Sequence, residues 1–80
     1  MREAILVPDL GVAEMVLSVW FVKPGEVVRE GGRVVELLLG NATFDVTAPA
    51  SGTLIEHSAR SSERVSPGQI VGYLETDGGH

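Results

Sequence analysis

The stretch that decides the fold is LLLGNATFDVTAPASGTL, residues 37–54. Two apolar, β-prone runs flank a Gly-Asn pair, and a second turn sequence, APASG, follows a few residues later. This pattern predicts a β-hairpin that turns at Gly40 and Asn41, followed by a reversal into another strand. The hairpin would present Asn41 at its tip, which raises the question of what an asparagine does there.

The composition bounds the class of protein. A chain of 80 residues is long enough for one small domain, and the absence of cysteine excludes a disulfide, a thiolate nucleophile and a zinc–thiolate site. The formal net charge is −5 and the six basic residues are scattered, so we expect no nucleic-acid binding. The longest apolar run, residues 15–22, is too short to span a membrane, and no signal peptide is recognised. We therefore expect a soluble intracellular domain with no membrane contact.

Short apolar and β-branched runs separated by Gly, Pro, Asn and Ser are typical of strands and turns. No window sustains the apolar periodicity of a helix. The sequence therefore predicts an all-β fold. We expect strands near residues 3–7, 15–22, 33–39, 43–48, 52–58 and 69–75, with short pairings at 27–28 and 64–65.

An internal repeat is found when the second half of the chain is laid on the first with an offset of 37 residues. The matching pairs are Leu17 and Leu54, Lys23 and Arg60, Glu26 and Glu63, Val28 and Val65, Gly31 and Gly68, Val34 and Val71, and Leu37 and Leu74. Each half has an apolar face that it cannot bury alone, which predicts a sandwich or flattened barrel with pseudo-twofold symmetry. In this arrangement the Gly40-Asn41 tip lies opposite the chain termini.

Four motifs cover nearly the whole chain: VPDLG (7–11), VWFVKPGEVVREGGRVVEL (19–37), VTAPASGTL (46–54) and VSPGQIVGYLE (65–75). Together they resemble the lipoyl domains of 2-oxo acid dehydrogenase complexes and, more distantly, the biotinyl domains of carboxylases. The resemblance implies a flattened barrel of two four-stranded antiparallel sheets. It also implies a lysine on an exposed hairpin, to which lipoate is attached through an amide.

The hairpin tip departs from this family pattern. In the family the tip usually reads as an acidic residue, Thr, Asp, Lys and Ala, whereas the aligned residues here are Leu38, Leu39, Gly40, Asn41 and Ala42. Lipoylation acylates a primary amine, and a carboxamide nitrogen is not a usable nucleophile under those conditions. We therefore expect no covalently bound cofactor on Asn41. The same reason excludes biotin, and the Met-Lys-Met pattern of biotinyl domains is absent. The only lysine, Lys23, is interpreted as a surface charge.

Two explanations of Asn41 remain open: natural divergence, or an engineered replacement of lysine in a lipoyl carrier domain for acyl transfer. Leu38 and Gly40 also stand where the family has acidic residues, which favours divergence. We expect a non-catalytic lipoyl-like domain at residues 1–76, with 77–80 as a flexible tail or the start of a linker. A biotinyl-type or export-adaptor barrel module is a further alternative.

The resemblance also implies the context in which such a domain works. It would belong to, or associate with, a dihydrolipoamide acyltransferase component and act as an interaction or spacing module. Its expected partners are the decarboxylase, acyltransferase or lipoamide dehydrogenase components of a 2-oxo acid dehydrogenase complex. The expected compartment is the cytoplasm, or the mitochondrial matrix if the source is eukaryotic.

Other candidate residues have simpler interpretations. His57 is expected to face outward from a strand, with no Cys, His or carboxylate partner at ligand spacing. No serine has the sequence pattern of a nucleophile with its base. Period-two alternation predicts Phe44 and Val46 inward and Asp45 outward. It also places Leu38 on the face with Val34 and Glu36, where it would be exposed and available as a docking contact.

Overall fold

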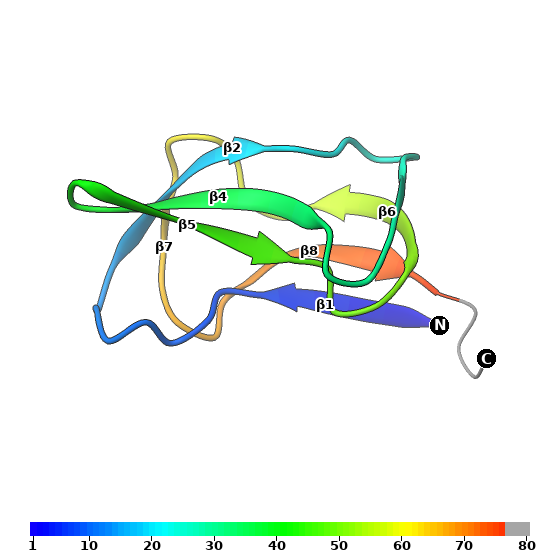
Figure 1. Cartoon of the computed structure of the whole chain (residues 1–80), viewed down its shortest axis with the longest axis horizontal. Helices are drawn as coiled ribbons and strands as arrows, with labels where there is room; N and C mark the ends of the chain where they lie inside the picture. Colours follow the sequence, from blue (N-terminus) through cyan, green and yellow to red (C-terminus); the bar gives the residue numbers. More distant parts are fainter. Residues whose placement is uncertain (77–80) are drawn as a thin grey trace.

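The computed structural model describes residues 1–76, and every regular element in this range is a β-strand. The all-β prediction is confirmed, and all eight expected strands are present (Figure 1). The predicted tail at 77–80 lies outside the described residues. The strands are β1 (Arg2–Leu6), β2 (Met15–Trp20), β3 (Val27–Val28), β4 (Arg33–Leu39), β5 (Ala42–Thr47), β6 (Gly52–His57), β7 (Arg64–Val65) and β8 (Ile70–Glu75).

The strands form two four-stranded sheets, with the orders β1-β8-β6-β3 and β5-β4-β2-β7. All pairings are antiparallel, as the resemblance implied. Both sheets contribute to a single core of buried aliphatic side chains. The side chains with no exposed surface are Leu17, Val34, Val35, Leu37, Leu54, Val71 and Leu74. Burial of these side chains is the main source of stability in a chain without disulfides.

The internal repeat is a structural repeat. The amide of Gly25 donates to the carbonyl of Leu54, and the amide of Ser62 donates to the carbonyl of Leu17, both at 2.7 Å. The two donors and the two acceptors are each separated by 37 residues (62 − 25 and 54 − 17). Gly25 and Ser62 also share a left-handed backbone, with φ of 97° and 75°. The same unit is therefore used twice, as pseudo-twofold symmetry requires.

A bulge in β4 corrects one prediction about its faces. Simple alternation placed Val34 on the outer face with Glu36 and Leu38, but Val34 and Val35 are both fully buried. The register against β5 shifts between Arg33 and Val35, and a bulge at this point turns two consecutive side chains inward. Beyond the bulge the predicted alternation holds up to the hairpin tip.

The two ends of the molecule differ. The β4–β5 hairpin projects at one end, whereas the N-terminus and the last turn of described chain lie at the other (Figure 1). At that second end the amide of Thr76 donates to the carbonyl of Met1 at 2.8 Å. The tip therefore lies opposite the N-terminus and the last described residue, along a long axis of 38 Å, as the repeat predicted for the described part of the chain. No helix in residues 1–76 is long and apolar enough to cross a membrane.

Candidate functional site

The hairpin turn consists of Gly40 and Asn41, because the β4–β5 ladder ends at the pair Leu39 and Ala42. Gly40 has φ of 63°, whereas Asn41 is not among the residues with positive φ. A left-handed first residue followed by an ordinary second residue is the requirement of a type II′ hairpin turn. The backbone therefore requires glycine at position 40 but places no such requirement on position 41. Asparagine is not there to form the turn.

The two leucines before the turn point to opposite faces of the sheet. Leu39 is half-buried and packs against the core. Leu38 lies on the outer face, where it is opposite Val16 of β2 and Thr43 of β5. It remains 36% exposed, which confirms that it is accessible close to the tip. Asn41 and Ala42 are also exposed.

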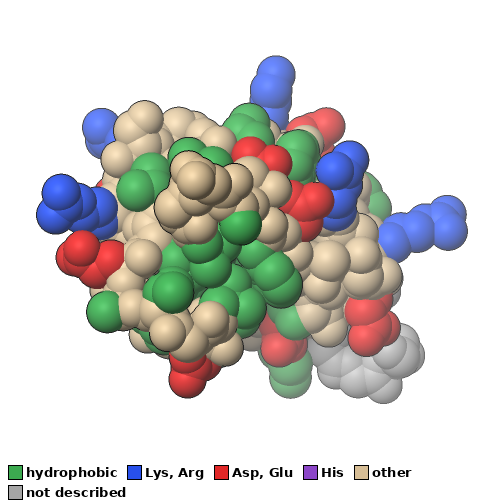
Figure 2. Space-filling model, turned by 60° about the vertical axis from the view of Figure 1, so that its left-hand side comes forward, with side chains coloured by type: hydrophobic (Ala, Val, Ile, Leu, Met, Phe, Trp, Pro, Cys, Tyr) green, Lys and Arg blue, Asp and Glu red, His purple; other side chains and the backbone are tan. Residues whose placement is uncertain are grey.

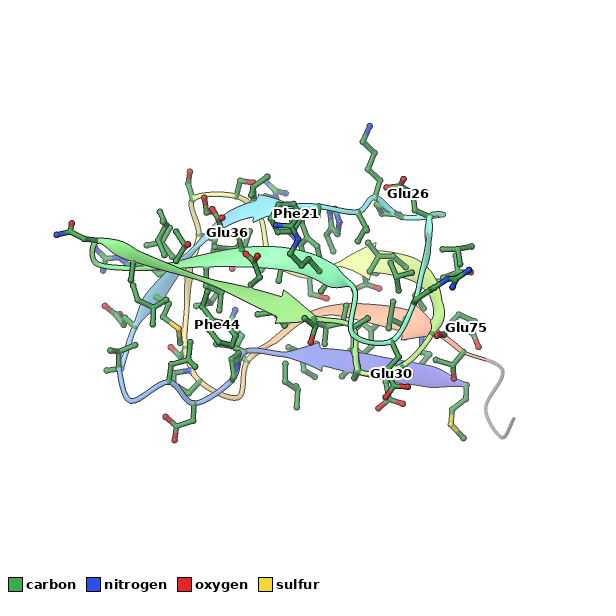
Figure 3. The ribbon with its side chains drawn as sticks, viewed as in Figure 1. Phe21, Glu26, Glu30, Glu36, Phe44 and Glu75 are labelled. Carbon is green, nitrogen blue, oxygen red and sulfur yellow. The ribbon has the colours of Figure 1, made fainter. Side chains whose placement is uncertain are left out.

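Phe44 and Val46 both face the core, as predicted, but they are buried to different extents. Val46 is buried, but Phe44 is 40% exposed. Phe44 lies opposite the fully buried Leu37 and so occupies the core-facing side of its strand. However, β5 is the edge strand of its sheet, so no further strand covers the outer flank of the ring. Figure 3 shows Phe44 on the side of β5 that faces β1.

The surface around the tip is apolar and uncharged. Residues 37–44 contain no charged side chain, and Figure 2, which turns this end forward, shows hydrophobic side chains gathered in its middle with charged ones around them. The nearest carboxylates along the strands are the opposed pair Glu36 and Asp45. Asp45 forms an ion pair with Arg33, with 3.3 Å between its Oδ2 and the Arg33 Nη1. The same guanidinium lies 4.7 Å from the ring centre of Phe21.

Lys23 is remote from the tip. Its amide donates to the Oε1 of Glu26 at 2.6 Å, and the amide of Glu26 donates back to the carbonyl of Lys23 at 3.0 Å. This exposed turn follows β2, and Figure 3 shows Glu26 far along the molecule from the hairpin tip. The structure thus brings Leu38, Leu39, Gly40, Asn41 and Ala42 together and leaves the only lysine outside the group.

His57 is half-buried and has specific contacts, so the interpretation of it as a simple outward-facing strand residue is wrong. Its ring stacks on Trp20 with the ring centres 4.0 Å apart, and its Nε2 lies 2.9 Å from the carbonyl oxygen of Val22. The Trp20 Nε1–H donates to the carbonyl of Ala59 at 2.9 Å. A Cβ at Gly72 would lie 2.9 Å from the Trp20 ring, so glycine there leaves room for the indole. His57 is a structural residue, and the glycine opposite it is the sequence signal that could have indicated the contact.

A surface groove of about 530 Å³ lies at the end opposite the tip. The Met1 amine lowers the pKa of Glu75, which lines the groove, by a hydrogen bond and by its charge. No group of three or more potential ligands in residues 1–76 could hold a metal ion. The groove is lined by Val27, Val28, Arg29, Ser51, Gly52, Thr53 and Glu75.

Two symmetric four-stranded sheets with an exposed tight hairpin at one end are the architecture that the resemblance to lipoyl and biotinyl domains implied. The biotin/lipoyl family model, described as "Biotin-requiring enzyme", matches residues 3–74. The chain therefore belongs to the biotin/lipoyl attachment domain family.

Similar proteins include acyltransferases and a solved lipoyl domain. The succinyltransferase component of the 2-oxoglutarate dehydrogenase complex of Bartonella vinsonii is 35% identical over 94% of this chain and 19% of its own length. The lipoamide acyltransferase of the branched-chain alpha-keto acid dehydrogenase complex of Pseudomonas putida is 29% identical over 92% of this chain and 18% of its length. The lipoyl domain of the Azotobacter vinelandii 2-oxoglutarate dehydrogenase complex gives a TM-score of 0.75 at 26% identity, covering 94% of this chain and 98% of that domain.

A second solved structure shows the fold alone. A single-chain, multi-domain long-chain acyl-CoA carboxylase gives a TM-score of 0.80 at 13% identity, over 98% of this chain and 7% of that protein. The chain spans less than a fifth of the length of the curated relatives it matches. It is thus homologous to the lipoyl domains of acyltransferase components, which are themselves much longer proteins.

Proposed function

We propose that this chain is a lipoyl-type domain, from a 2-oxo acid dehydrogenase acyltransferase component or a relative, that carries no lipoate on its hairpin. It acts through protein contacts, as an interaction or spacing module, and it is not itself catalytic. The observation that carries the proposal is Asn41 at the tip of the projecting hairpin. The similarity to acyltransferase components supports the context.

The chemistry of attachment supports the absence of lipoate. A lipoyl group is joined to its domain by an amide between its carboxyl carbon and a primary amine. The nitrogen lone pair of the Asn41 carboxamide is delocalised into the carbonyl group, so it does not attack an activated acyl carbon. Lys23 carries the only side-chain amine, and it stands in a different turn, which is held by Glu26. No amine is therefore presented on the hairpin.

The surface at the tip supports a role in protein contacts. Apolar side chains gather at this end, and a hydrophobic area rimmed by charge is a common feature of protein interaction sites. Complete burial of a leucine is worth about 1.5–3 kcal/mol, so burying the exposed 36% of Leu38 would contribute about 0.5–1 kcal/mol. Leu38 alone would give a weak contact, and Phe44 would have to contribute with it.

The test is the intact mass of the chain after co-expression with a lipoate-attaching enzyme in the presence of lipoate. We expect no lipoyl adduct. Asn41→Lys is the matched variant, because position 41 has no conformational restriction and can accept lysine. Lys23→Arg is the control for reaction at the other amine. A lipoyl adduct on the unsubstituted chain would overturn the proposal.

A second candidate is an acyl carrier whose lysine was replaced by engineering. It is favoured by one observation: the hairpin keeps the backbone and the exposure that a modified residue would need. If Asn41→Lys is lipoylated and then reductively acylated by its decarboxylase, the carrier interpretation is supported. If Asn41→Lys stays unmodified, the lipoate-attaching enzyme no longer recognises a hairpin with uncharged residues at positions 38 and 40, as natural divergence predicts.

A further inference from the structure

The tip sequence Asn41-Ala42-Thr43 has the form Asn-X-Thr with X other than proline. This is the acceptor sequence for attachment of a sugar to asparagine, which is used on accessible surface segments and mainly in secreted proteins. Asn41 is the only asparagine in the chain. The acceptor sequence therefore coincides with the one place in the fold that the attachment family uses to present a residue.

The structure makes all three residues of the acceptor sequence accessible. Asn41, Ala42 and Thr43 are exposed, and Asn41 occupies the second position of the turn. The hairpin projects beyond the body of the molecule (Figure 1). Ala42 and Thr43 belong to β5, which is hydrogen-bonded to β4 on one side and has no strand on the other. A transferase could therefore approach the backbone of β5 from its open side without unfolding the core.

The neighbouring side chains do not obstruct this approach. Thr43 lies on the outer face opposite Leu38, so its hydroxyl points away from the core. None of the described side-chain hydrogen bonds or ion pairs of the chain involves Asn41 or Thr43. The nearest charge along β5 is Asp45, which is already paired with Arg33. The amide and the hydroxyl are thus both available to an enzyme.

We infer that Asn41 is an acceptor for N-linked glycosylation, so that the tip carries a sugar where the family carries lipoate or biotin. The co-substrate is a sugar activated as a diphosphate. The transferase has to activate the Asn41 amide by taking its nitrogen lone pair out of conjugation with the carbonyl group. The Asn41 Nδ2 then forms a bond to the anomeric carbon, the bond from that carbon to the diphosphate oxygen breaks, and the diphosphate leaves with the electron pair. One amide proton passes to a base of the transferase, and nothing is oxidised or reduced. Thr43 is a recognition residue that positions the amide.

This inference goes beyond the proposed function, because it concerns a covalent group and not the absence of lipoate. The diphosphate leaving group has two possible carriers. A soluble transferase would use a nucleotide-linked sugar in the cytosol, whereas a membrane-bound transferase would use a lipid-linked sugar on an exported chain. Both leave the same bond at Asn41, so the location of the modified chain distinguishes them.

The test starts from the full natural protein, purified from its own cells and weighed intact. We expect a mass excess of one or more hexose or N-acetylhexosamine units, assigned to Asn41 by peptide fragmentation and removed by a glycan-releasing amidase. Fractionation of the same cells identifies the donor: a glycosylated chain in the cytosol indicates a nucleotide sugar, and one in the exported fraction indicates a lipid-linked sugar. An unmodified mass in every fraction overturns the inference.

Variants of Thr43 supply the matched control. Thr43→Val keeps the shape and the strand preference but removes the hydroxyl, whereas Thr43→Ser keeps the hydroxyl. Expressed in the natural host, Thr43→Val should lose the sugar and Thr43→Ser should keep it, with unchanged far-ultraviolet circular dichroism in both. A sugar that persists in Thr43→Val would overturn the inference. A lipoyl adduct has a different mass and resists the amidase, so failure of the proposed function is recognised separately.

Discussion

Gly52 lies in the APASG turn sequence at the start of β6, and replacing it with alanine should destabilise the fold strongly. A Cβ at Gly52 would lie 2.3 Å from the carbonyl oxygen of Glu75 and 3.2 Å from the Cγ2 of Thr76. The oxygen belongs to the backbone of β8, which pairs with β6 at the neighbouring Thr53. The two strands would have to separate by about 1 Å before Cβ and oxygen reached ordinary contact, because packed interiors tolerate little overlap.

The magnitude follows from two costs and one gain. Overpacking costs about 1–3 kcal/mol, and weakening one backbone hydrogen bond between β6 and β8 costs about 1 kcal/mol. Replacing glycine with alanine in a strand raises the free energy of unfolding by about 0.5–1 kcal/mol, because the unfolded chain loses conformational freedom. The Gly52→Ala substitution should therefore lower the free energy of unfolding by about 1–3.5 kcal/mol.

The assay is urea unfolding followed by circular dichroism, together with thermal unfolding. For a domain of this size we expect a thermal midpoint about 10–20 °C lower. Gly32→Ala is the matched control, since its Cβ would lie 3.0 Å from the carbonyl oxygen of Arg29 in an accessible turn and should cost less than about 1 kcal/mol. If Gly52→Ala is no more destabilising than Gly32→Ala, the reasoning from the close approach of β6 and β8 is refuted.

The remaining predictions concern the tip, the repeat and the terminal ion pair. Leu38→Asp should weaken binding to a purified dehydrogenase-complex component at least severalfold, by calorimetric titration, with the thermal midpoint nearly unchanged; equal affinity would argue against Leu38 as a contact. Ser62→Gly should raise stability by up to about 1 kcal/mol while Gly25→Ser lowers it, because both positions have positive φ; urea midpoints that shift in the same direction would contradict this. The Met1 amine depresses the folded-state pKa of Glu75. The Glu75 carboxylate therefore contributes stability above its unfolded-state pKa, and this contribution is lost as the pH falls through the folded-state pKa. In Glu75→Gln this part of the acid dependence of the urea midpoint should disappear, and an unchanged dependence would show that other groups cause it.

Local patterns predicted most of the fold because they agree with its long-range pairing. Gly40 was predictable from the turn between two apolar runs, and the 37-residue repeat predicted the pseudo-twofold symmetry that the hydrogen bonds of Gly25 and Ser62 follow. The misses have a different origin. The inward turn of Val34 depends on a bulge. Phe44 faces inward as predicted, but its partial exposure depends on the edge position of β5. Neither is encoded in the alternation of a single strand.

The misses around His57 show how a site can be hidden in a sequence. His57, Trp20 and Gly72 lie far apart in the chain, and the stack forms only because the two sheets bring an indole over a glycine. A single histidine in a sequence gives little indication of its contacts. The reason for glycine at position 72 is also not apparent from the sequence, because it depends on the Trp20 ring that packs against it. The tip residues were found because they are consecutive, and the hairpin alone places them together.

The conformation of the hairpin tip does not explain why position 41 is an asparagine. A type II′ turn needs Gly40 and leaves position 41 free, so turn chemistry does not account for asparagine. The neutral flank also gives no electrostatic reason for a polar residue there. What remains is the side chain itself, an exposed carboxamide two residues before the hydroxyl of Thr43 on an open edge strand. The proposed function leaves this position without lipoate, and the accessibility of the carboxamide is what the inferred attachment of a sugar rests on.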